Sequence, residues 1–340
     1  MILQKKIFEL MKKINEFGNF KINKYLKKNM IFQPSKIDLE ITTKCNLKCI
    51  FCQVPDWDRK KLQDMSFNKF KYILDQIPFL SLIKLQGMGE SFLNKDIFKM
   101  IEFANKKGIK IETTTNGTIL SKEKIKKLFK NPPSKISFSL DTPNNITYKK
   151  LRGKNMFNDI INNIRLTIDE KNKTKSNTKI RIWCILNKYN IDQVPDLIRL
   201  AKKLTVDELV IQTKISSFGK LNLKDKNKKI KVNVFKKEIL SKLNKAKEFA
   251  KKKELKLTVF KENYFTKTDP CNFIKSNPYI SVEGEIVPCC IIADPKIISL
   301  GNIFKEKFTK IWNNKKYKQL RKAHNKNILP NFCKDCYLIK

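Results

Sequence analysis

The sequence predicts an α/β fold in which six strand–helix units form one parallel sheet, curled into a partial (β/α)6 barrel, with a small C-terminal α+β domain. Three observations predict this fold. Strand-like and helix-like segments alternate along the chain, the strands alternate apolar and polar side chains, and the pattern stops near residue 255. We therefore expect a lead-in segment at 1–36, a barrel at 37–255 and a C-terminal domain at 256–340.

The lead-in segment is the first element. Residues 1–36 have the pattern of one or two basic amphipathic helices that end near Gln33. The segment has lysines at its apolar positions and lacks a cleavage site, so we expect no secretory signal and a cytoplasmic protein. Apolar runs elsewhere, such as 180–186, are far shorter than the roughly 20 residues that cross a bilayer.

The strand–helix units come next. The expected strands are 37–42, 82–87, 109–115, 135–140, 179–186 and 208–213, and the expected helices are 66–78, 94–107, 121–130, 155–172, 191–204 and 235–253. Apolar side chains on one strand parity, such as Ile37 and Leu39, should face the helices. The other parity is mostly polar. A sheet buried on both faces or a closed eight-stranded barrel would be apolar there, so we expect an open, polar lumen.

The chain is strongly basic, with a net charge of +41 from 73 Lys and Arg against 32 Asp and Glu. Such a charge is typical of proteins that bind nucleic acid or an anionic membrane. Only six of these basic residues are arginine, however, and the lysines are spread over the whole chain. Specific polyanion sites favour arginine forks. We therefore expect no nucleic-acid partner, and an RNA-modifying enzyme is kept as an alternative.

Three cysteines follow the first strand, with the spacing Cys45-x3-Cys49-x2-Cys52. The carboxyl ends of parallel strands gather active-site loops, and cytosolic cysteines are metal ligands or reactive thiols more often than disulfides. Three thiolates can ligate three irons of a cubane cluster and leave the fourth iron open. Structural zinc would need a fourth ligand nearby, and the single histidine, His324, is remote in sequence. An electron-carrying cluster with a distant fourth cysteine is a further alternative.

This arrangement, with Phe51 before the third cysteine, resembles the radical S-adenosylmethionine (SAM) superfamily over nearly the whole chain. The resemblance implies a 4Fe–4S cluster on Cys45, Cys49 and Cys52, whose open iron binds SAM through its amino and carboxylate groups. Reductive cleavage of SAM then gives a 5′-deoxyadenosyl radical, which abstracts a substrate hydrogen atom. The resemblance also implies a reductant such as flavodoxin or ferredoxin.

Further motifs at the ends of the next strands resemble the SAM-binding motifs of that superfamily. The residues implied to contact SAM are Gly87, Gly89, Glu90, Asn116, Ser139, Asp141 and Arg152. Met88 stands where the superfamily commonly has a glycine. By resemblance, Arg152 pairs with the carboxylate of SAM, and a helix-surface ion pair is the alternative for this arginine. Gln86 and Asn187 are weaker candidates.

A second set of cysteines lies in the C-terminal domain, around a predicted hairpin at 279–288. Its members are Cys271, Cys289, Cys333 and Cys336. Four thiolates complete a cubane cluster with no open iron, and tetrathiolate zinc is the alternative. The pattern resembles the SPASM/twitch class of extensions. Because the sequence ends four residues past the last cysteine, we expect the twitch version with one auxiliary 4Fe–4S cluster. Cys290 is an alternative to Cys289 as ligand, and Cys184 should lie in the core.

The substrate is the least determined part of the prediction. With one histidine, expected on a helix surface, proton transfer must use other groups. The candidates in the lumen are Asp38, Glu40, Glu112, Arg181 and Lys214. Twitch relatives act on carbohydrates, aminocyclitols and nucleotides, and SPASM relatives act on ribosomally made peptides. Because 36 lysine-rich residues are too few for a peptide-recognition domain, we expect a small polar substrate such as a sugar or cyclitol alcohol. A peptide maturase and a non-catalytic electron carrier are the alternatives.

Overall fold

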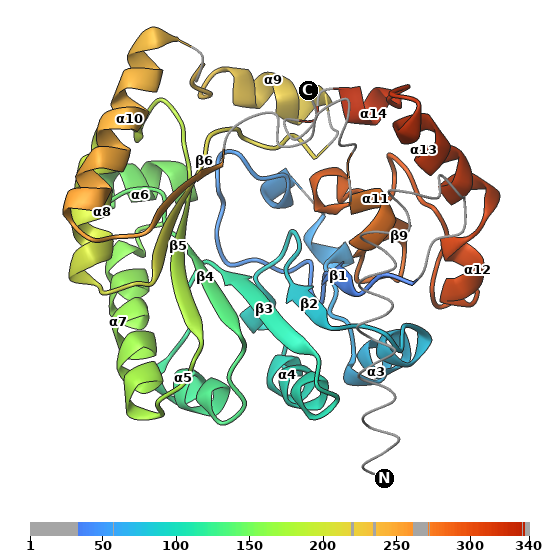
Figure 1. The fold of residues 1–340 in the computed structure, drawn as a ribbon. Coiled ribbons are helices and arrows are strands. Elements are labelled where there is room, and N and C mark those ends of the chain that lie inside the picture. The colour runs from blue at the N-terminus through green and yellow to red at the C-terminus, as the bar shows by residue number, and fades with distance from the viewer. Residues whose placement is uncertain are drawn as a thin grey trace.

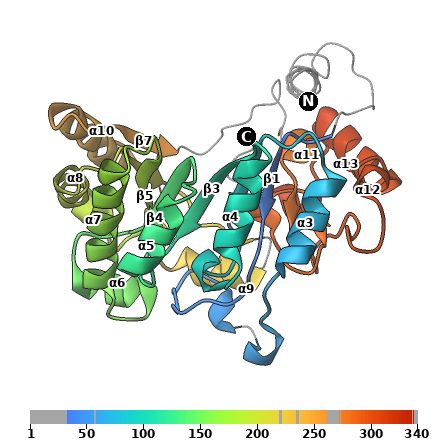
Figure 2. The ribbon, with the colours of Figure 1, turned by 90° about the horizontal axis from the view of Figure 1, so that it is seen from below.

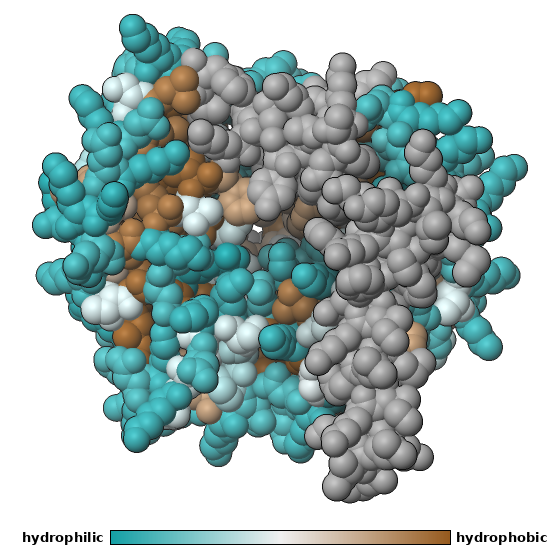
Figure 3. Space-filling model, viewed as in Figure 1, coloured by the Kyte–Doolittle hydropathy of each residue, from teal (hydrophilic) through white to brown (hydrophobic). Residues whose placement is uncertain are grey.

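The computed structural model of the chain describes residues 33–56, 58–218, 221–233, 236–260, 271, 273–334 and 336. Nearly all of the expected lead-in segment therefore lies outside the described residues. Within the described ranges, every helix is too short or too polar to cross a bilayer. Hydrophilic residues cover most of the described surface on the face seen in Figure 3, as the lysine content predicts.

Seven parallel strands form the barrel sheet, in the same order in space as in the chain. They are β1 (Lys36–Leu39), β2 (Leu82–Leu85), β3 (Lys110–Thr115), β4 (Lys135–Ser139), β5 (Lys179–Ile185), β6 (Glu208–Gln212) and β7 (Leu257–Phe260). The six predicted strands are confirmed. The seventh was not predicted: β7 pairs in parallel with β6, so the barrel sheet continues past the expected boundary at 255.

Helices cover the outer face of the curved sheet (Figures 1 and 2). They are α3 (Phe67–Gln76), α4 (Ile97–Lys106), α5 (Lys122–Phe129), α7 (Phe157–Lys173), α8 (Val194–Lys203) and α10 (Lys237–Lys252). Serine residues cap the N-termini of two of these helices. The side chains of Ser66 and Ser121 accept hydrogen bonds from backbone N–H groups in the first turns of α3 and α5. Two further helices on the barrel, α6 (Asn145–Arg152) and α9 (Leu221–Lys228), were not predicted.

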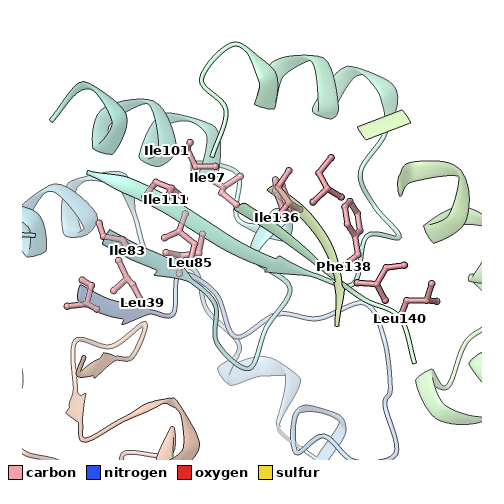
Figure 4. Packing of buried hydrophobic residues seen from close by; sticks show 14 of the residues in the cluster. Leu39, Ile83, Leu85, Ile97, Ile101, Ile111, Ile136, Phe138 and Leu140 are labelled. Atoms are coloured by element: carbon pink, nitrogen blue, oxygen red, sulfur yellow. The ribbon is translucent and has the colours of Figure 1, made fainter. Parts of the chain in front are cut away.

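The apolar strand parity packs against these helices, as predicted. Figure 4 shows side chains from four neighbouring strands gathered beside Ile97 and Ile101 of α4. None of the labelled residues is more than 1% exposed: Leu39, Ile83, Leu85, Ile97, Ile101, Ile111, Ile136, Phe138 and Leu140. Burying each such side chain contributes about 1.5–3 kcal/mol. Cys184 belongs to the same core, so its predicted position is confirmed.

The C-terminal domain extends the barrel sheet. Strand β8 (Tyr279–Ile280) pairs in parallel with β1, and β9 (Ile286–Val287) pairs antiparallel with β8. Gly284 turns the hairpin at a φ of +84°, where a Cβ atom would lie 2.4 Å from the ring of Phe304. The predicted hairpin is confirmed, and its pairing with β1 was not foreseen. The helices of the domain are α11 (Phe273–Ser276), α12 (Phe308–Trp312), α13 (Lys315–Asn325) and α14 (Asn331–Lys334).

Candidate active site and auxiliary cysteine site

The cysteine loop, residues 45–52, leaves the carboxyl end of β1 and is held by the end of α6. The backbone N–H groups of Lys48 and Ile50 donate to the carbonyl oxygens of Arg152 and Leu151 over 3.1 and 3.0 Å. Gly153 ends α6 at a φ of +75°, and a Cβ atom there would lie 2.5 Å from the Lys48 carbonyl oxygen. The loop and the helix end therefore fit together only with glycine at this position.

The three thiols of the loop lie close together. Cys45, Cys49 and Cys52 contact one buried apolar cluster that includes Leu47 and Phe51. Burial raises the pKa of Cys45 to about 11 and that of Cys52 to about 12, and the neighbouring Cys49 sulfur raises both. Among the described residues, no three Cys, His, Asp or Glu side chains are close enough to hold a single metal ion. A cubane cluster spreads its ligands over several iron atoms, so three neighbouring sulfurs that are too far apart for one ion still fit a three-ligand iron–sulfur cluster.

Residues 87–90, called the glycine motif below, pack against the end of β1 and the start of the cysteine loop. A Cβ atom on Gly89 would lie 2.3 Å from the carbonyl oxygen of Thr42, and one on Gly87 would lie 2.5 Å from Cγ of Glu40. The N–H of Glu90 donates to the Lys44 carbonyl over 2.7 Å. Both glycines are therefore needed for the motif to lie against the end of β1 and the start of the cysteine loop.

Glu90 organises the loop that follows β3. Its buried carboxylate accepts hydrogen bonds from Thr115 Oγ1 at 2.7 Å, from the Asn116 N–H at 2.6 Å and from the Phe92 N–H at 3.2 Å. Burial raises the pKa of Glu90. Asn116 in turn donates through Nδ2 to Asn46 Oδ1 over 2.9 Å. These two predicted SAM contacts are thus joined to each other and to the cysteine loop.

Arg152 lies beside the cysteine loop, and it is buried. Its guanidinium forms an ion pair with Asp141, with 2.6 Å between NH2 and Oδ2, and NH1 lies 3.7 Å from the Cys49 sulfur. Asp141 also accepts a hydrogen bond from the Ile185 N–H over 2.8 Å. The ion pair that was the alternative for Arg152 is therefore present, but it is buried and not on the helix surface, because both side chains are less than 10% exposed.

The other predicted polar residues are spread over the barrel. Ser139 lies at the carboxyl end of β4, opposite Trp183 of β5. Gln86 donates through Nε2 to Asp38 Oδ1 over 2.9 Å, on the lumen parity of β1. Asn187 is fully buried, where it shapes the turn after β5 through hydrogen bonds with neighbouring backbone groups.

Glu40 bridges two parts of the molecule. Its buried carboxylate accepts from the Met88 N–H at 3.0 Å and from the Val282 N–H at 3.3 Å. Glu40 thereby connects the glycine motif to the C-terminal hairpin through β1. Burial raises the pKa of this carboxyl.

Two lumen candidates lie toward the amino ends of the strands. Glu112 forms an ion pair with Lys135 at 2.8 Å, and Arg181 donates through Nε to Ser137 Oγ over 2.7 Å. Both are away from the cysteine loop, which leaves the carboxyl end of β1. Lys214 follows β6, and its carbonyl oxygen accepts from Gln212 Nε2 over 2.6 Å.

The structure also gathers the second set of cysteines. Burial raises the pKa of the Cys289 thiol well above its usual range, and the sulfurs of Cys271, Cys336 and Cys333 raise it further. Cys290 lies apart from these sulfurs. It packs with the apolar cluster of Tyr279 and Met88, and burial and the nearby Asp38 carboxylate raise its pKa. The geometry therefore favours Cys289 over Cys290 as the member of the four-sulfur set.

Three buried polar residues of α13 were missed as site residues. Tyr317, Arg321 and His324 are at most 2% exposed, so the expected surface position of His324 is wrong. Their spacing puts them on one helical face. That spacing was the available signal, but polar residues on a lysine-rich helix suggest an exposed face.

Comparisons with known proteins agree with these two sites. The model of the radical SAM superfamily matches residues 39–201, and the model of the iron–sulfur cluster-binding SPASM domain matches residues 271–337. Together they cover more than half of the chain.

The chain is similar to two relatives and to one solved structure over most of its length. The tungsten-containing aldehyde ferredoxin oxidoreductase cofactor-modifying protein of Pyrococcus furiosus is 26% identical over 88% of this chain and 86% of its own length. The antilisterial bacteriocin subtilosin biosynthesis protein AlbA of Bacillus subtilis is 23% identical over 90% of this chain and 67% of its own length. The crystal structure of Streptococcus suis SuiB bound to precursor peptide SuiA has a TM-score of 0.70, at 18% identity, over 86% of this chain and 68% of that chain.

The family models imply the cofactors. A radical SAM domain works with a 4Fe–4S cluster and SAM, and a SPASM domain binds auxiliary iron–sulfur clusters. The neighbouring thiols of the cysteine loop and the four gathered thiols of the C-terminal domain fit such groups. The chain therefore belongs to the radical SAM superfamily, as an enzyme with a C-terminal SPASM domain.

Proposed function

We propose that this enzyme removes a hydrogen atom from a small polar substrate, such as a sugar or cyclitol alcohol, held in the barrel lumen. The observation that carries the proposal is the polar lining of that lumen. Half-buried Trp183 donates through Nε1 to Gln212 Oε1 over 3.1 Å. Its ring contacts the Arg181 guanidinium at 4.8 Å and the Phe260 ring at 5.5 Å. A fixed aromatic ring beside an amide suits a polyol, whose C–H groups stack and whose hydroxyls form hydrogen bonds.

In the proposed active site, Cys45, Cys49 and Cys52 hold the SAM-binding cluster. When bound, the cluster and SAM supply the electron and the 5′-deoxyadenosyl radical that removes the hydrogen atom. Arg152, oriented by Asp141, contributes positive charge for the carboxylate of SAM. The remaining proposed SAM contacts are Gly87, Gly89, Glu90, Asn116 and Ser139. Both carboxylate oxygens of Glu90 already accept hydrogen bonds from Thr115 and Asn116, which supports a role for Glu90 in positioning Asn116.

In the C-terminal domain, Cys271, Cys289, Cys333 and Cys336 are the proposed ligands of one auxiliary cluster. The group would either accept an electron from the substrate, which gives net oxidation, or anchor the substrate. The contact of Glu40 with both the glycine motif and the hairpin supports a fixed spacing between the two cysteine sites. Flavodoxin or ferredoxin is the proposed reductant.

Peptide modification is the second candidate function. Two named proteins favour it: the subtilosin biosynthesis protein is similar over 90% of this chain, and the matching SuiB structure contains a precursor peptide. A peptide could reach the lumen from the open side of the barrel with one side chain at the reacting position. This candidate uses the same proposed cysteine ligands and differs in the substrate alone.

One isotope experiment separates the candidates. Reconstituted, reduced enzyme is incubated with SAM and with either carbon-deuterated cyclitols and sugars or deuterated peptides, and deuterium is measured in the 5′-deoxyadenosine product. We expect transfer from a polyol. Transfer from peptides alone would favour the second candidate. No 5′-deoxyadenosine at all, or equal yields from a Cys45/Cys49/Cys52 triple alanine variant, would contradict the radical mechanism. Cys184→Ala is the matched control, because this cysteine lies in the core.

A further inference from the structure

Helix α13 presents three buried polar side chains on one face, beside the second set of cysteines. Tyr317, Arg321 and His324 are 0%, 2% and 2% exposed. Each has one atom without a hydrogen-bond partner among the described residues: the Tyr317 hydroxyl, Arg321 NH2 and His324 Nε2. Buried polar atoms in folded proteins nearly always have partners. Three unpartnered atoms on one helical face therefore indicate a group that is bound there in the working enzyme.

Arg321 shows what charge that group carries. Its guanidinium donates to the carbonyl oxygens of Trp312 over 2.7 Å and Ile274 over 3.2 Å, and it lies 4.4 Å from the centre of the Tyr317 ring. None of the ion pairs that the structure describes includes Arg321. Burial lowers its pKa to about 10, so the side chain stays protonated at neutral pH. A buried cation without an anion is strongly unfavourable, and an anionic group nearby would offset that cost.

The position of this face relative to the cysteines identifies the group. Burial raises the pKa of Tyr317, and the neighbouring Cys289 sulfur raises it further. The carbonyl oxygen that accepts from Arg321 belongs to Ile274 in α11, three residues after Cys271, and α11 packs on α13. The face of α13 is thus near Cys289 and beside the segment that follows Cys271. An iron–sulfur cluster with four thiolates is an anion, and its sulfur atoms accept hydrogen bonds.

We propose that the Tyr317 hydroxyl donates a hydrogen bond to a sulfur atom of the auxiliary cluster, and that Arg321 adds a buried positive charge beside it, so that both raise the reduction potential of this cluster. The proposal rests on the cysteine ligands proposed above. Reduction makes the cluster more negative, so a donated hydrogen bond and a nearby cation stabilise the reduced form more than the oxidised form. Tyr317 and Arg321 tune the potential of the cluster in this role, and neither needs to touch the substrate.

The test measures the potential directly. The Cys45/Cys49/Cys52 triple alanine variant serves as background, so that the auxiliary cluster alone gives the signal. In that background, Tyr317→Phe, Arg321→Met and Arg321→Lys are titrated potentiometrically and followed by electron paramagnetic resonance. Iron content and circular dichroism are measured on each sample. Tyr72→Phe is the matched control, since this tyrosine is 44% exposed on α3.

We expect Tyr317→Phe and Arg321→Met each to lower the ratio of reduced to oxidised cluster at a fixed potential by about three- to tenfold. A tenfold change corresponds to a midpoint about 59 mV lower for one electron. Arg321→Lys, which keeps the charge, and the control should stay near the background value. Unchanged midpoints in fully loaded Tyr317→Phe and Arg321→Met would overturn the proposal. Loss of iron from both would also overturn it, because the two residues would then act in folding alone.

A failure of the ligand assignment gives a different result. If the background variant itself binds zinc or no metal with Tyr317 and Arg321 intact, then the auxiliary ligands are wrong. That outcome is visible in the metal content before any potential is measured. The two failures are therefore distinguishable.

Discussion

Replacing Glu40 by alanine should strongly destabilise the junction of β1, the glycine motif and the C-terminal hairpin. The carboxylate accepts two backbone hydrogen bonds, from Met88 at 3.0 Å and Val282 at 3.3 Å. Alanine removes both acceptors and leaves the N–H groups unpaired, and each buried unpaired donor costs about 1–3 kcal/mol. We therefore expect the free energy of unfolding to fall by about 2–6 kcal/mol, a large fraction of the total for a typical domain.

Anaerobic urea unfolding of the metal-free protein, followed by circular dichroism, measures this change. Glu102→Ala is the control, because this carboxylate lies on the surface of α4 with a single partner, Lys106, and should leave the midpoint nearly unchanged. A Glu40→Ala midpoint equal to that of the control would refute the reasoning. It would mean that the two N–H groups find other acceptors or water.

The remaining predictions concern the pH dependence of stability at Glu40, the Asp141–Arg152 ion pair, and the iron content of the two cysteine sites. Burial raises the folded-state pKa of Glu40 above 4.5, so its contribution to stability is full below about pH 4.5 and is lost as pH rises through the raised pKa. The Glu40→Gln variant should lose less stability than the unsubstituted protein over that pH range, as urea midpoints would show. The opposite trend in the midpoints would contradict this. Asp141→Asn should cost about 3–5 kcal/mol in unfolding free energy, since it leaves its buried arginine partner unpaired. Gly89→Ala, whose Cβ would lie 2.3 Å from a carbonyl oxygen, should lower iron in the first site alone, as iron analysis of the two sites would show. Cys290→Ser should keep the auxiliary iron that Cys289→Ser loses, and equal losses would sink the assignment.

Features that depend on short sequence distances could be predicted from the sequence. The spacing of Cys45, Cys49 and Cys52 lies within one loop, and the alternating strand pattern repeats six times. Strand β7 was missed because it has only four residues, and their burial does not alternate, since all four are half-buried. Its assignment depends on pairing with β6, which the local pattern does not contain.

Long-range contacts explain what the sequence could not show about the sites. Glu40 looked like a lumen acid, but its partner Val282 lies 242 residues later in the chain. Arg152 was predicted to face SAM, and its burial and its pair with Asp141 depend on the packing of α6 on the cysteine loop. His324 lies on a lysine-rich helix, and only the packing of α11 and α13 buries it.

The pairing of β8 with β1 has a consequence for how the enzyme can be divided. Backbone groups of β1 donate to Pro278 and Ile280 over 3.0 Å, so the C-terminal hairpin occupies what would otherwise be an open strand edge. Cutting the chain before Cys271 would leave a row of unsatisfied N–H and C=O groups along the first strand, next to the cysteine loop. Such an edge pairs readily with other chains. The second domain therefore also protects the first from pairing along this edge, and one continuous sheet joins the two domains.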